Sequence, residues 1–230
     1  MAKRKTLRFD YLTIFPEVIH PYVQASMLGR AARKRLLSFH AHNLRRWTHD
    51  RHKTVDDKPF GGGPGMLMKP QPFLEALAWL KLRNIKTGRR RTGAARARVI
   101  ATAANGKPFT HADAARLATR YTRIVFLCGR YEGMDQRILD RLADEVFSIG
   151  PYVLTGGELP ALVMTDAIAR HVPGVLGKEA SLAEESWSDG EGEYPQYTRP
   201  ETWLGIKVPK ILLSGHHKDI EAWKKAHRMH

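Results

Sequence analysis

The chain has 230 residues, enough to bury a sizeable core as one large domain, with or without an appendage. Its apolar fraction of 43% is typical of a folded protein, and no run approaches the ~20 apolar residues that span a bilayer. The basic N-terminus is not followed by the apolar core of a signal peptide. The single cysteine, Cys128, excludes a disulfide within the chain and a cysteine-cage zinc site. We therefore expect a cytoplasmic protein with no membrane partner.

Positive charge is in excess, with 38 Lys and Arg against 23 Asp and Glu and a net charge of +15. This excess favours a polyanionic partner, although solubility alone is an alternative explanation. Residues 81–98 contain eight basic residues and no acid. Such a stripe predicts salt-dependent phosphate contacts, made by a flexible loop or a basic helix end.

In the first half of the chain, apolar periodicity and turn residues predict alternating strands and helices. The predicted elements are a strand over 6–14, a helix from 15–17 onward, a short helix over 26–35, a strand over 36–44 and a helix over 67–82. Residues 45–66 have no regular pattern and contain the glycine-rich run 61–65. Glycine lets the backbone approach a ligand because it has no Cβ.

In the second half, the pattern predicts strands over 99–103 and 124–128 and helices over 112–119, 137–143 and 159–170. We interpret the apolar alternation of 149–154 as a further buried strand. Strands alternating with helices predict an α/β fold with a mostly parallel sheet. Glycine-containing turns follow at Gly129 and Gly156-Gly157. Because ligands bind at the carboxyl ends of strands in open α/β sheets, we expect a ligand site at these turns.

The last fifty residues change character. Residues 179–198 contain six acidic residues before position 194, which predicts a linker or a lid. Apolar alternation follows over 203–213, and a short amphipathic helix is predicted over 219–228. We expect a small C-terminal unit from about residue 195.

Several long blocks, in a fixed order, resemble the bacterial tRNA (guanine-N1)-methyltransferase family of the knotted SPOUT superfamily. They are CGRYEGMD at 128–135, SIGPYVLTGGELPA at 148–161, PGVLG at 173–177, THDRHKTVDDKPFGGGPGM at 48–66 and YTRP at 197–200. The resemblance covers the chain from Phe9 to about Trp223. It implies an α/β SPOUT-type fold, a mostly parallel sheet with a deep trefoil knot made by the loops after Ala103, Cys128 and Ile149. It also implies a methyltransferase domain over 1–177 that binds S-adenosylmethionine (SAM), an acidic interdomain loop over 178–195, and a small abbreviated helical unit over 196–230 that binds tRNA.

The resemblance implies methyl transfer from SAM to N1 of guanine 37, just 3′ of the tRNA anticodon. N1 of neutral guanine carries a proton, so a general base must remove it while O6 gathers negative charge. The family pattern assigns the base to Glu185, with Glu184 as a competitor, and the stabilisation of O6 to Arg170. A solvated acidic loop is the alternative explanation for both glutamates.

The resemblance also implies binding residues and partners. The residues expected to hold SAM are Ala103, Ala104, Gly129, Glu132, Ile149, Gly150, Pro151, Tyr152, Val153, Leu154, Gly156 and Gly157. Those expected to contact tRNA are Asp50, Arg51, Gly61, Arg130 and Glu132. For Arg130 and Glu132, a salt bridge at a strand end is the alternative. Family members are homodimers in which the acidic loop of one chain caps the other chain's donor site, and they depend on magnesium, for which this sequence identifies no ligands.

The sequence departs from the family pattern at three places. Glu185 stands where Asp is usual, so the carboxylate must be repositioned by one methylene. Pro151 also replaces Asp, which removes a backbone donor and a carboxylate beside the donor pocket. The chain stops at His230, where typical members continue with helices that grip tRNA, and we expect the extra positive charge to compensate. Two rivals remain: a SPOUT ribose 2′-O-methyltransferase, and a basic RNA-binding module without catalysis.

Overall fold

The computed structural model describes residues 6–176 and 193–228, which belong to two compact units, 1–177 and 178–230. The strands of the first unit are β1 (Leu7–Thr13), β2 (Leu37–Asn43), β3 (Asp56–Asp57), β4 (Leu67–Met68), β5 (Ala97–Pro108), β6 (Arg123–Cys128) and β7 (Glu145–Ser148). Its helices are α1 (Pro16–Gln24), α2 (Ser26–Arg33), η1 (Leu44–Trp47), α3 (Pro70–Trp79), η2 (Thr92–Ala94), α4 (His111–Arg120), α5 (Gln136–Arg141) and α6 (Glu158–Arg170). No helix among the described residues is long and apolar enough to cross a membrane.

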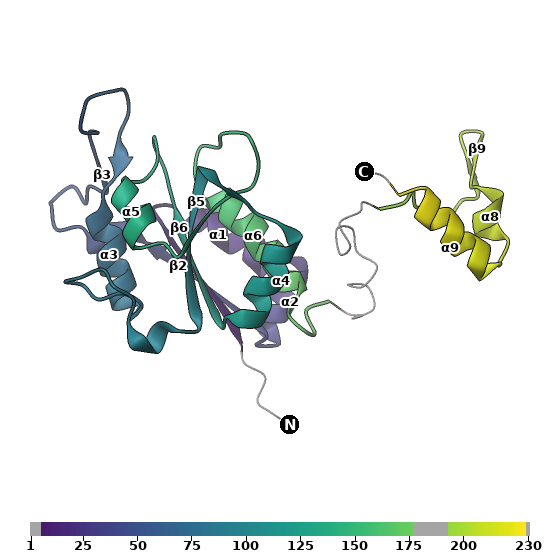
Figure 1. Ribbon diagram of the computed structural model, residues 1–230, viewed down its shortest axis with the longest axis horizontal. Coiled ribbons are helices and arrows are strands. Elements are labelled where there is room, and N and C mark those ends of the chain that lie inside the picture. The colour runs from purple at the N-terminus through teal and green to yellow at the C-terminus, as the bar shows by residue number, and fades with distance from the viewer. Residues whose placement is uncertain (1–5, 177–192, 229–230) are drawn as a thin grey trace. The chain divides into compact units, whose positions relative to one another are not determined.

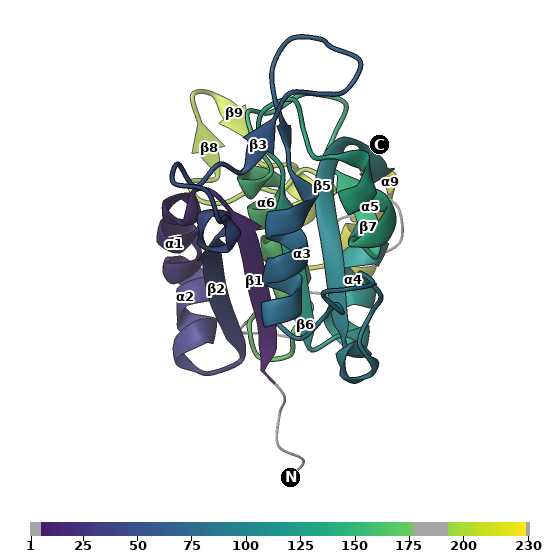
Figure 2. The same ribbon diagram turned by 90° about the vertical axis from the view of Figure 1, so that its left-hand side faces the viewer.

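The core of the first unit is a five-stranded sheet in the order β2-β1-β6-β5-β7, with every neighbouring pair parallel (Figure 1). This confirms the predicted α/β class with a mostly parallel sheet. The prediction of a trefoil knot stays a prediction, as do the proposed domain boundaries. Helices α1, α2, α4 and α6 pack on one face, while α3 and α5 cover the other (Figure 2).

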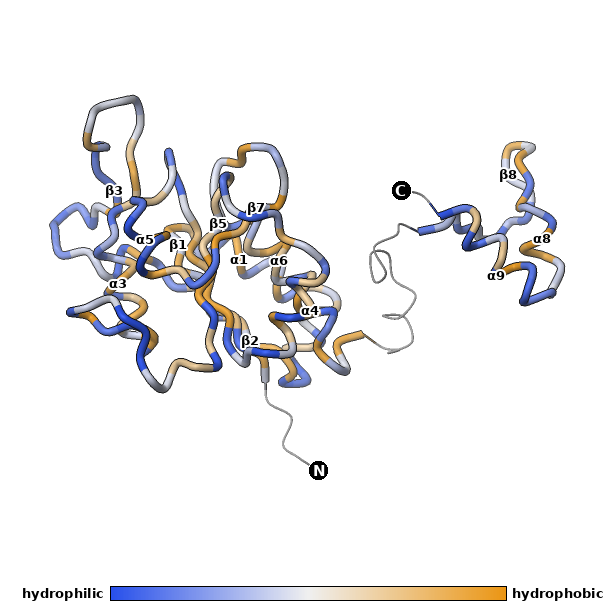
Figure 3. The backbone as a smooth tube through the Cα atoms, in the orientation of Figure 1, coloured by the Kyte–Doolittle hydropathy of each residue, from blue (hydrophilic) through white to orange (hydrophobic). Residues whose placement is uncertain are grey.

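Strand side chains alternate between two hydrophobic clusters, one on each face of the sheet. In β6, Ile124 and Phe126 face one cluster and Val125 and Leu127 the other, all fully buried. The continuous apolar run predicted such a strand, because a strand covered on both faces has no polar side. The central strands are accordingly the most hydrophobic parts of the backbone in Figure 3.

A buried carboxylate ties the sheet together on the α3 side. Asp10 of β1 is fully buried and accepts hydrogen bonds from Arg8, from His42 of β2 (2.7 Å to Nε2) and from Arg123 of β6 (2.7 Å to Nε). Burial alone would raise the pKa of Asp10, but these hydrogen bonds outweigh it and hold that pKa well below its usual range. The ion cluster therefore depends on Asp10 staying charged.

The carboxyl ends of β5 and β7 differ from the sequence prediction. Both Thr102 and Lys107 align with Phe147, so residues 103–106 leave the ladder and β5 resumes beyond the predicted turn. A Cβ on Gly106 would lie 2.6 Å from the Phe147 carbonyl carbon, so the close approach requires glycine. The strand predicted over 149–154 is wrong: β7 ends at Ser148, and the following loop leaves Val153 86% exposed. Pro151 in that loop cannot donate to a strand ladder.

The basic segment 81–98 is an ordered turn whose charges are partly neutralised. Arg83 is buried and donates to Asp144 at 2.6 Å, and Arg90 reaches the other oxygen of Asp144 at 3.2 Å. Arg98 pairs with Glu145 at 2.6 Å. The predicted acid-free, flexible stripe is therefore wrong for these three side chains. Four other cations remain exposed: Lys86, Arg89, Arg91 and Arg96.

Helix α1 is joined to α6 by a polar contact at the surface. The Tyr22 hydroxyl donates to the Asp166 carboxylate at 2.7 Å. This hydrogen bond, more than partial burial, raises the pKa of Tyr22 to about 12. The phenol is thus held in its neutral, donating form.

The second unit contains β8 (Thr202–Trp203), β9 (Ile206–Lys207), α8 (Lys210–Leu213) and α9 (His217–Ala226). The predicted C-terminal helix is confirmed as α9, while the alternation over 203–213 forms a short hairpin and α8. Among residues 193–228 none is buried. Trp223 stacks on His227 at 4.2 Å, and Leu204 at the hairpin turn is 79% exposed.

Candidate active site

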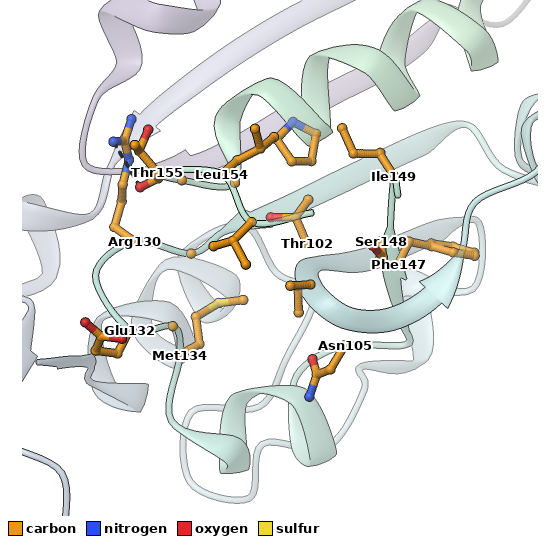
Figure 4. A pocket seen from close by; sticks show the side chains of 18 of the residues that line it. Thr102, Asn105, Arg130, Glu132, Met134, Phe147, Ser148, Ile149, Leu154 and Thr155 are labelled. Carbon is orange, nitrogen blue, oxygen red and sulfur yellow. Dashed lines mark hydrogen bonds between the residues drawn. The ribbon is translucent and has the colours of Figure 1, made fainter. Parts of the chain in front are cut away.

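A cavity of about 400 Å³ lies at the carboxyl edge of the sheet (Figure 4). Its walls come from residues 102–105 after the regular part of β5, from residues 129–139 after β6, and from residues 147–160 around the loop between β7 and α6. Pockets of this size hold small molecules such as cofactors. The site lies where the two glycine-containing turns predicted one.

Most residues predicted to hold the methyl donor come together around this cavity. Those lining it are Ala103, Ala104, Gly129, Glu132, Ile149, Gly150, Tyr152, Val153, Leu154, Gly156 and Gly157. Pro151 is absent from the described lining. The sequence prediction missed other lining residues, among them Asn105, Leu139 and Phe147, because they lie beside the motif blocks rather than within them. Donor binding by these residues stays a prediction.

The glycines of the cavity wall are required by packing between the loops. A Cβ on Gly157 would lie 2.1 Å from the Thr102 hydroxyl and 2.7 Å from the backbone nitrogen of Gly129. A Cβ on Gly156 would lie 2.2 Å from Nε of Arg130. The Gly157 N–H also donates to the Gly129 carbonyl at 2.8 Å. The loop before α6 therefore lies directly against the end of β6, which sequence reasoning attributed to ligand approach instead.

Arg130 is held at the rim of the cavity by several partners. Its Nε donates to Glu158 at 2.9 Å, and Nη1 donates to the Thr155 carbonyl at 3.3 Å. Its guanidinium lies over the Phe15 ring, 4.6 Å from the centroid. Arg130 thus forms an ion pair at a strand end, as the alternative explanation held, but with Glu158 rather than with Glu132.

Glu132 connects the cavity to the glycine-rich loop. Its backbone N–H donates to the Met66 carbonyl at 3.1 Å, and its side chain fills the space that a Cβ on Gly65 would occupy. Gly61 and Gly65 both have positive φ, of 86° and 80°, which favours glycine. The loop extends beyond the sheet, and Phe60 in it is fully exposed (Figures 1 and 2). The predicted tRNA-contacting loop is therefore attached to the cavity wall.

Asp50 and Arg51 lie in a turn on the way to this loop. The Asp50 carboxylate accepts hydrogen bonds from the hydroxyl and the N–H of Thr54, and these lower its pKa. Arg51 is exposed. Neither residue lines the cavity, so a tRNA-contacting role for them stays a prediction.

The two residues assigned to catalysis are not both within the described structure. Arg170 is the last residue of α6, whereas the first turn of that helix lines the cavity. At a rise of 1.5 Å per residue, Arg170 lies about 18 Å along the helix from Glu158. It is not among the residues lining the cavity of its own chain. Glu185 and its competitor Glu184 lie outside the described residues.

Neither a metal cluster nor a reactive thiol accompanies the cavity. Within residues 6–176 and 193–228, no group of three or more His, Cys, Asp or Glu side chains could hold a metal ion. Cys128 is fully buried, and burial raises the pKa of its thiol well above the usual value. The described residues therefore offer binding surface and fixed hydrogen-bonding groups.

These features define a parallel α/β protein with a small-molecule site at the carboxyl edge of its sheet, bordered by a glycine-rich loop and an anchored arginine. A sequence profile of the family described as tRNA (guanine-1)-methyltransferase TrmD matches residues 7–230. The chain belongs to this family, and with it to the SPOUT superfamily. The predicted resemblance and the predicted enzyme class are thus confirmed.

Curated relatives agree along nearly the whole chain, and each bears the name tRNA (guanine-N(1)-)-methyltransferase. The protein of Heliobacterium modesticaldum is 48% identical over 219 residues, covering 95% of this chain and 79% of the relative. That of Rhodococcus jostii is 49% identical over 223 residues, covering 95% and 93%. That of Clostridioides difficile is 43% identical over 220 residues, covering 95% and 91%.

Proposed function

We propose that this protein transfers a methyl group from SAM to N1 of guanine 37 in tRNA. The observation that carries the proposal is the cavity at the carboxyl edge of the sheet, in a chain of the tRNA (guanine-1)-methyltransferase family. The excess of positive charge suits a tRNA substrate, and we place the enzyme in the cytoplasm.

The chemistry of the cavity fits SAM. Apolar side chains such as Leu139, Ile149 and Leu154 suit an adenine ring, and exposed backbone of residues 103–105 offers hydrogen-bonding groups. The Glu132 carboxylate suits the positive charge of the methionine part. When bound there, SAM would supply an electrophilic methyl group on a sulfonium centre. The chain's own contribution is to bind it, orient it and keep it beside the tRNA.

The acid–base work is assigned to two side chains. The Glu185 carboxylate takes the proton from guanine N1, and the Arg170 guanidinium donates hydrogen bonds to O6 as negative charge develops. General-base help contributes typically about 10²–10⁴-fold in rate, and an aimed donor about 10²–10³-fold. Magnesium dependence, expected from the resemblance, has no ligand set within the described residues.

The position of Arg170 supports a homodimer with shared sites. Arg170 lies about 18 Å along α6 from the cavity of its own chain, so we propose that it serves the cavity of a partner chain. Leu159 and Val163 lie one turn apart on α6 and are 54% and 51% exposed. These two side chains form an apolar stripe that a second copy would cover.

The reaction is tested with tRNA transcripts carrying G37 or A37. We expect methylation of the G37 transcript only, on N1, with large losses of kcat for Glu185→Gln and Arg170→Ala. A methyl group on a ribose 2′ oxygen would instead identify the rival methyltransferase. Failure to bind SAM in calorimetry would identify a pure RNA-binding module.

Sharing of sites between chains is tested by mixing two inactive variants. Leu154→Glu places a carboxylate in the cavity, whereas Arg170→Ala leaves the cavity intact. With statistical exchange, half of the dimers contain one of each, and we expect recovery of about a quarter of wild-type activity. No recovery, with exchange of chains shown by mass spectrometry, would mean that Arg170 acts within its own chain.

A further inference from the structure

Glu158 is a buried charge at the start of the helix that borders the cavity. It is 1% exposed, and carboxylates are rarely buried without partners. One of its oxygens accepts the hydroxyl of Thr13, and the other accepts Nε of Arg130 at 2.9 Å. Thr13 ends β1, is fully buried, and also accepts the N–H of Phe15 at 2.9 Å. Glu158 therefore connects the end of β1 to the arginine at the cavity rim.

These contacts leave the Arg130 guanidinium little freedom. Its Nε and Nη1 are engaged by Glu158 and by the Thr155 carbonyl, and one face lies on the Phe15 ring. Backbone contact at Gly156 blocks movement on another side. Figure 4 shows the side chain beside Thr155 at one end of the pocket, and it remains 21% exposed. An arginine has five N–H donors, so several stay available at the rim.

A stabilising role alone is a weak explanation for this arrangement. Replacing a buried ion pair by packed apolar residues is often neutral or stabilising, so such pairs are poor evidence for stability. This pair instead fixes a planar, multidentate donor of the kind that binds phosphate and polar base edges. Pre-set geometry also lowers the entropy lost on binding.

We propose that Thr13 and Glu158 are positioning residues that hold Arg130 so that its remaining N–H groups bind acceptor oxygens of the target nucleotide of tRNA. This inference rests on the proposed function. Because Glu158 acts through Arg130, its removal weakens tRNA use and leaves SAM binding intact.

The test compares steady-state kinetics with tRNA and the Kd for SAM. We expect Glu158→Gln to lower kcat/KM for tRNA at least tenfold, with the Kd for SAM changed less than twofold. Thr13→Val is expected to give a smaller loss in the same direction, and Thr13→Ser to restore wild-type values. Glu145→Gln is the matched control, because Glu145 pairs with Arg98 and Arg116 but does not line the cavity.

A double-mutant cycle separates positioning from structural support. In an Arg130→Met background, Glu158→Gln is expected to cause no further loss, since the group it positions is absent. A full additional loss in that background, or an unchanged kcat/KM for Glu158→Gln alone, would overturn the inference. If Glu158→Gln does not fold, Thr13→Val decides by the same two criteria. Absence of N1 methylation by the wild-type enzyme would instead refute the proposed function.

Discussion

Substitution of Gly157 by alanine tests whether packing between loops explains the glycines of the cavity wall. Gly157 has a φ of −83°, which alanine adopts freely, so the change tests space alone. The added Cβ would lie 2.1 Å from the Thr102 hydroxyl, 2.7 Å from the Gly129 nitrogen and 2.9 Å from the Cys128 Cα. The last two atoms belong to the backbone after and at the end of β6. They cannot rotate away, so the loop before α6 must move outward.

The expected cost follows from the size of this overlap. Overpacking a tight site costs typically about 1–3 kcal/mol, and two fixed backbone contacts place Gly157→Ala at about 2–3 kcal/mol. For a chain of this length, each kcal/mol lowers Tm by roughly 2–4 °C, so we expect a decrease of about 5–10 °C. The same shift breaks the hydrogen bond from Gly157 to Gly129 and displaces the cavity wall. SAM affinity should therefore fall together with stability.

The assay is thermal unfolding followed by circular dichroism, with the Kd for SAM from calorimetry. Gly93→Ala is the matched control, because its Cβ would meet no atom within 4 Å, and we expect no change. Adding Thr102→Ala to Gly157→Ala removes only the side-chain contact, so the double variant should remain destabilised. An unchanged Tm for Gly157→Ala, or complete rescue by Thr102→Ala, would show that the backbone contact does not explain this glycine.

Three other predictions follow from the charged groups. Asp10→Asn leaves two arginines without their shared anion and should cost about 3 kcal/mol in urea unfolding at neutral pH. Since the pKa of Asp10 is depressed, its contribution is present above the ordinary value near 4 and lost as pH falls, so the two proteins should converge in acid. Arg89→Gln with Arg91→Gln should weaken tRNA binding and flatten its salt dependence by about 0.7–0.9 per phosphate contact without lowering Tm, whereas Arg90→Gln should lower Tm. Equal effects of these two variants on Tm would contradict the assigned ion pair. Tyr22→Phe should abolish a phenol titration near pH 12, because the raised pKa preserves the hydrogen bond below pH 10 and loses it toward pH 12; a spectrum unchanged between the two proteins would refute this.

The elements that sequence predicted correctly are those set by local patterns. The uninterrupted apolar run 124–128 predicted a strand buried on both faces because no other element needs so many consecutive apolar residues. The glycine-containing turns correctly placed a site at the carboxyl edge of the sheet. The pattern over 149–154 misled, since those apolar side chains line a cavity or face solvent rather than a strand's two faces.

Contacts between distant segments were beyond the reach of local patterns. The acids that neutralise the basic segment, Asp144 and Glu145, lie 45 to 61 residues away from their partners. A count of charges along the chain therefore overestimated the number of free cations. Thr13 and Glu158 are 145 residues apart, and neither position by itself suggests a shared hydrogen bond. The one available signal was the glutamate directly after Gly156-Gly157, where a helix start favours an acid.

Helix α6 connects the two ends of the proposed mechanism. Its first residue, Glu158, holds the arginine at the cavity of its own chain, and its last residue, Arg170, is assigned to the cavity of the partner. A helix of this length moves as one body when its first turn is displaced, because each turn is tied to the next by hydrogen bonds. Displacement of the first turn by Gly157→Ala must therefore also move Arg170. In a mixed dimer of wild-type and Gly157→Ala chains, both sites should lose activity, one through its cavity and the other through the arginine it receives.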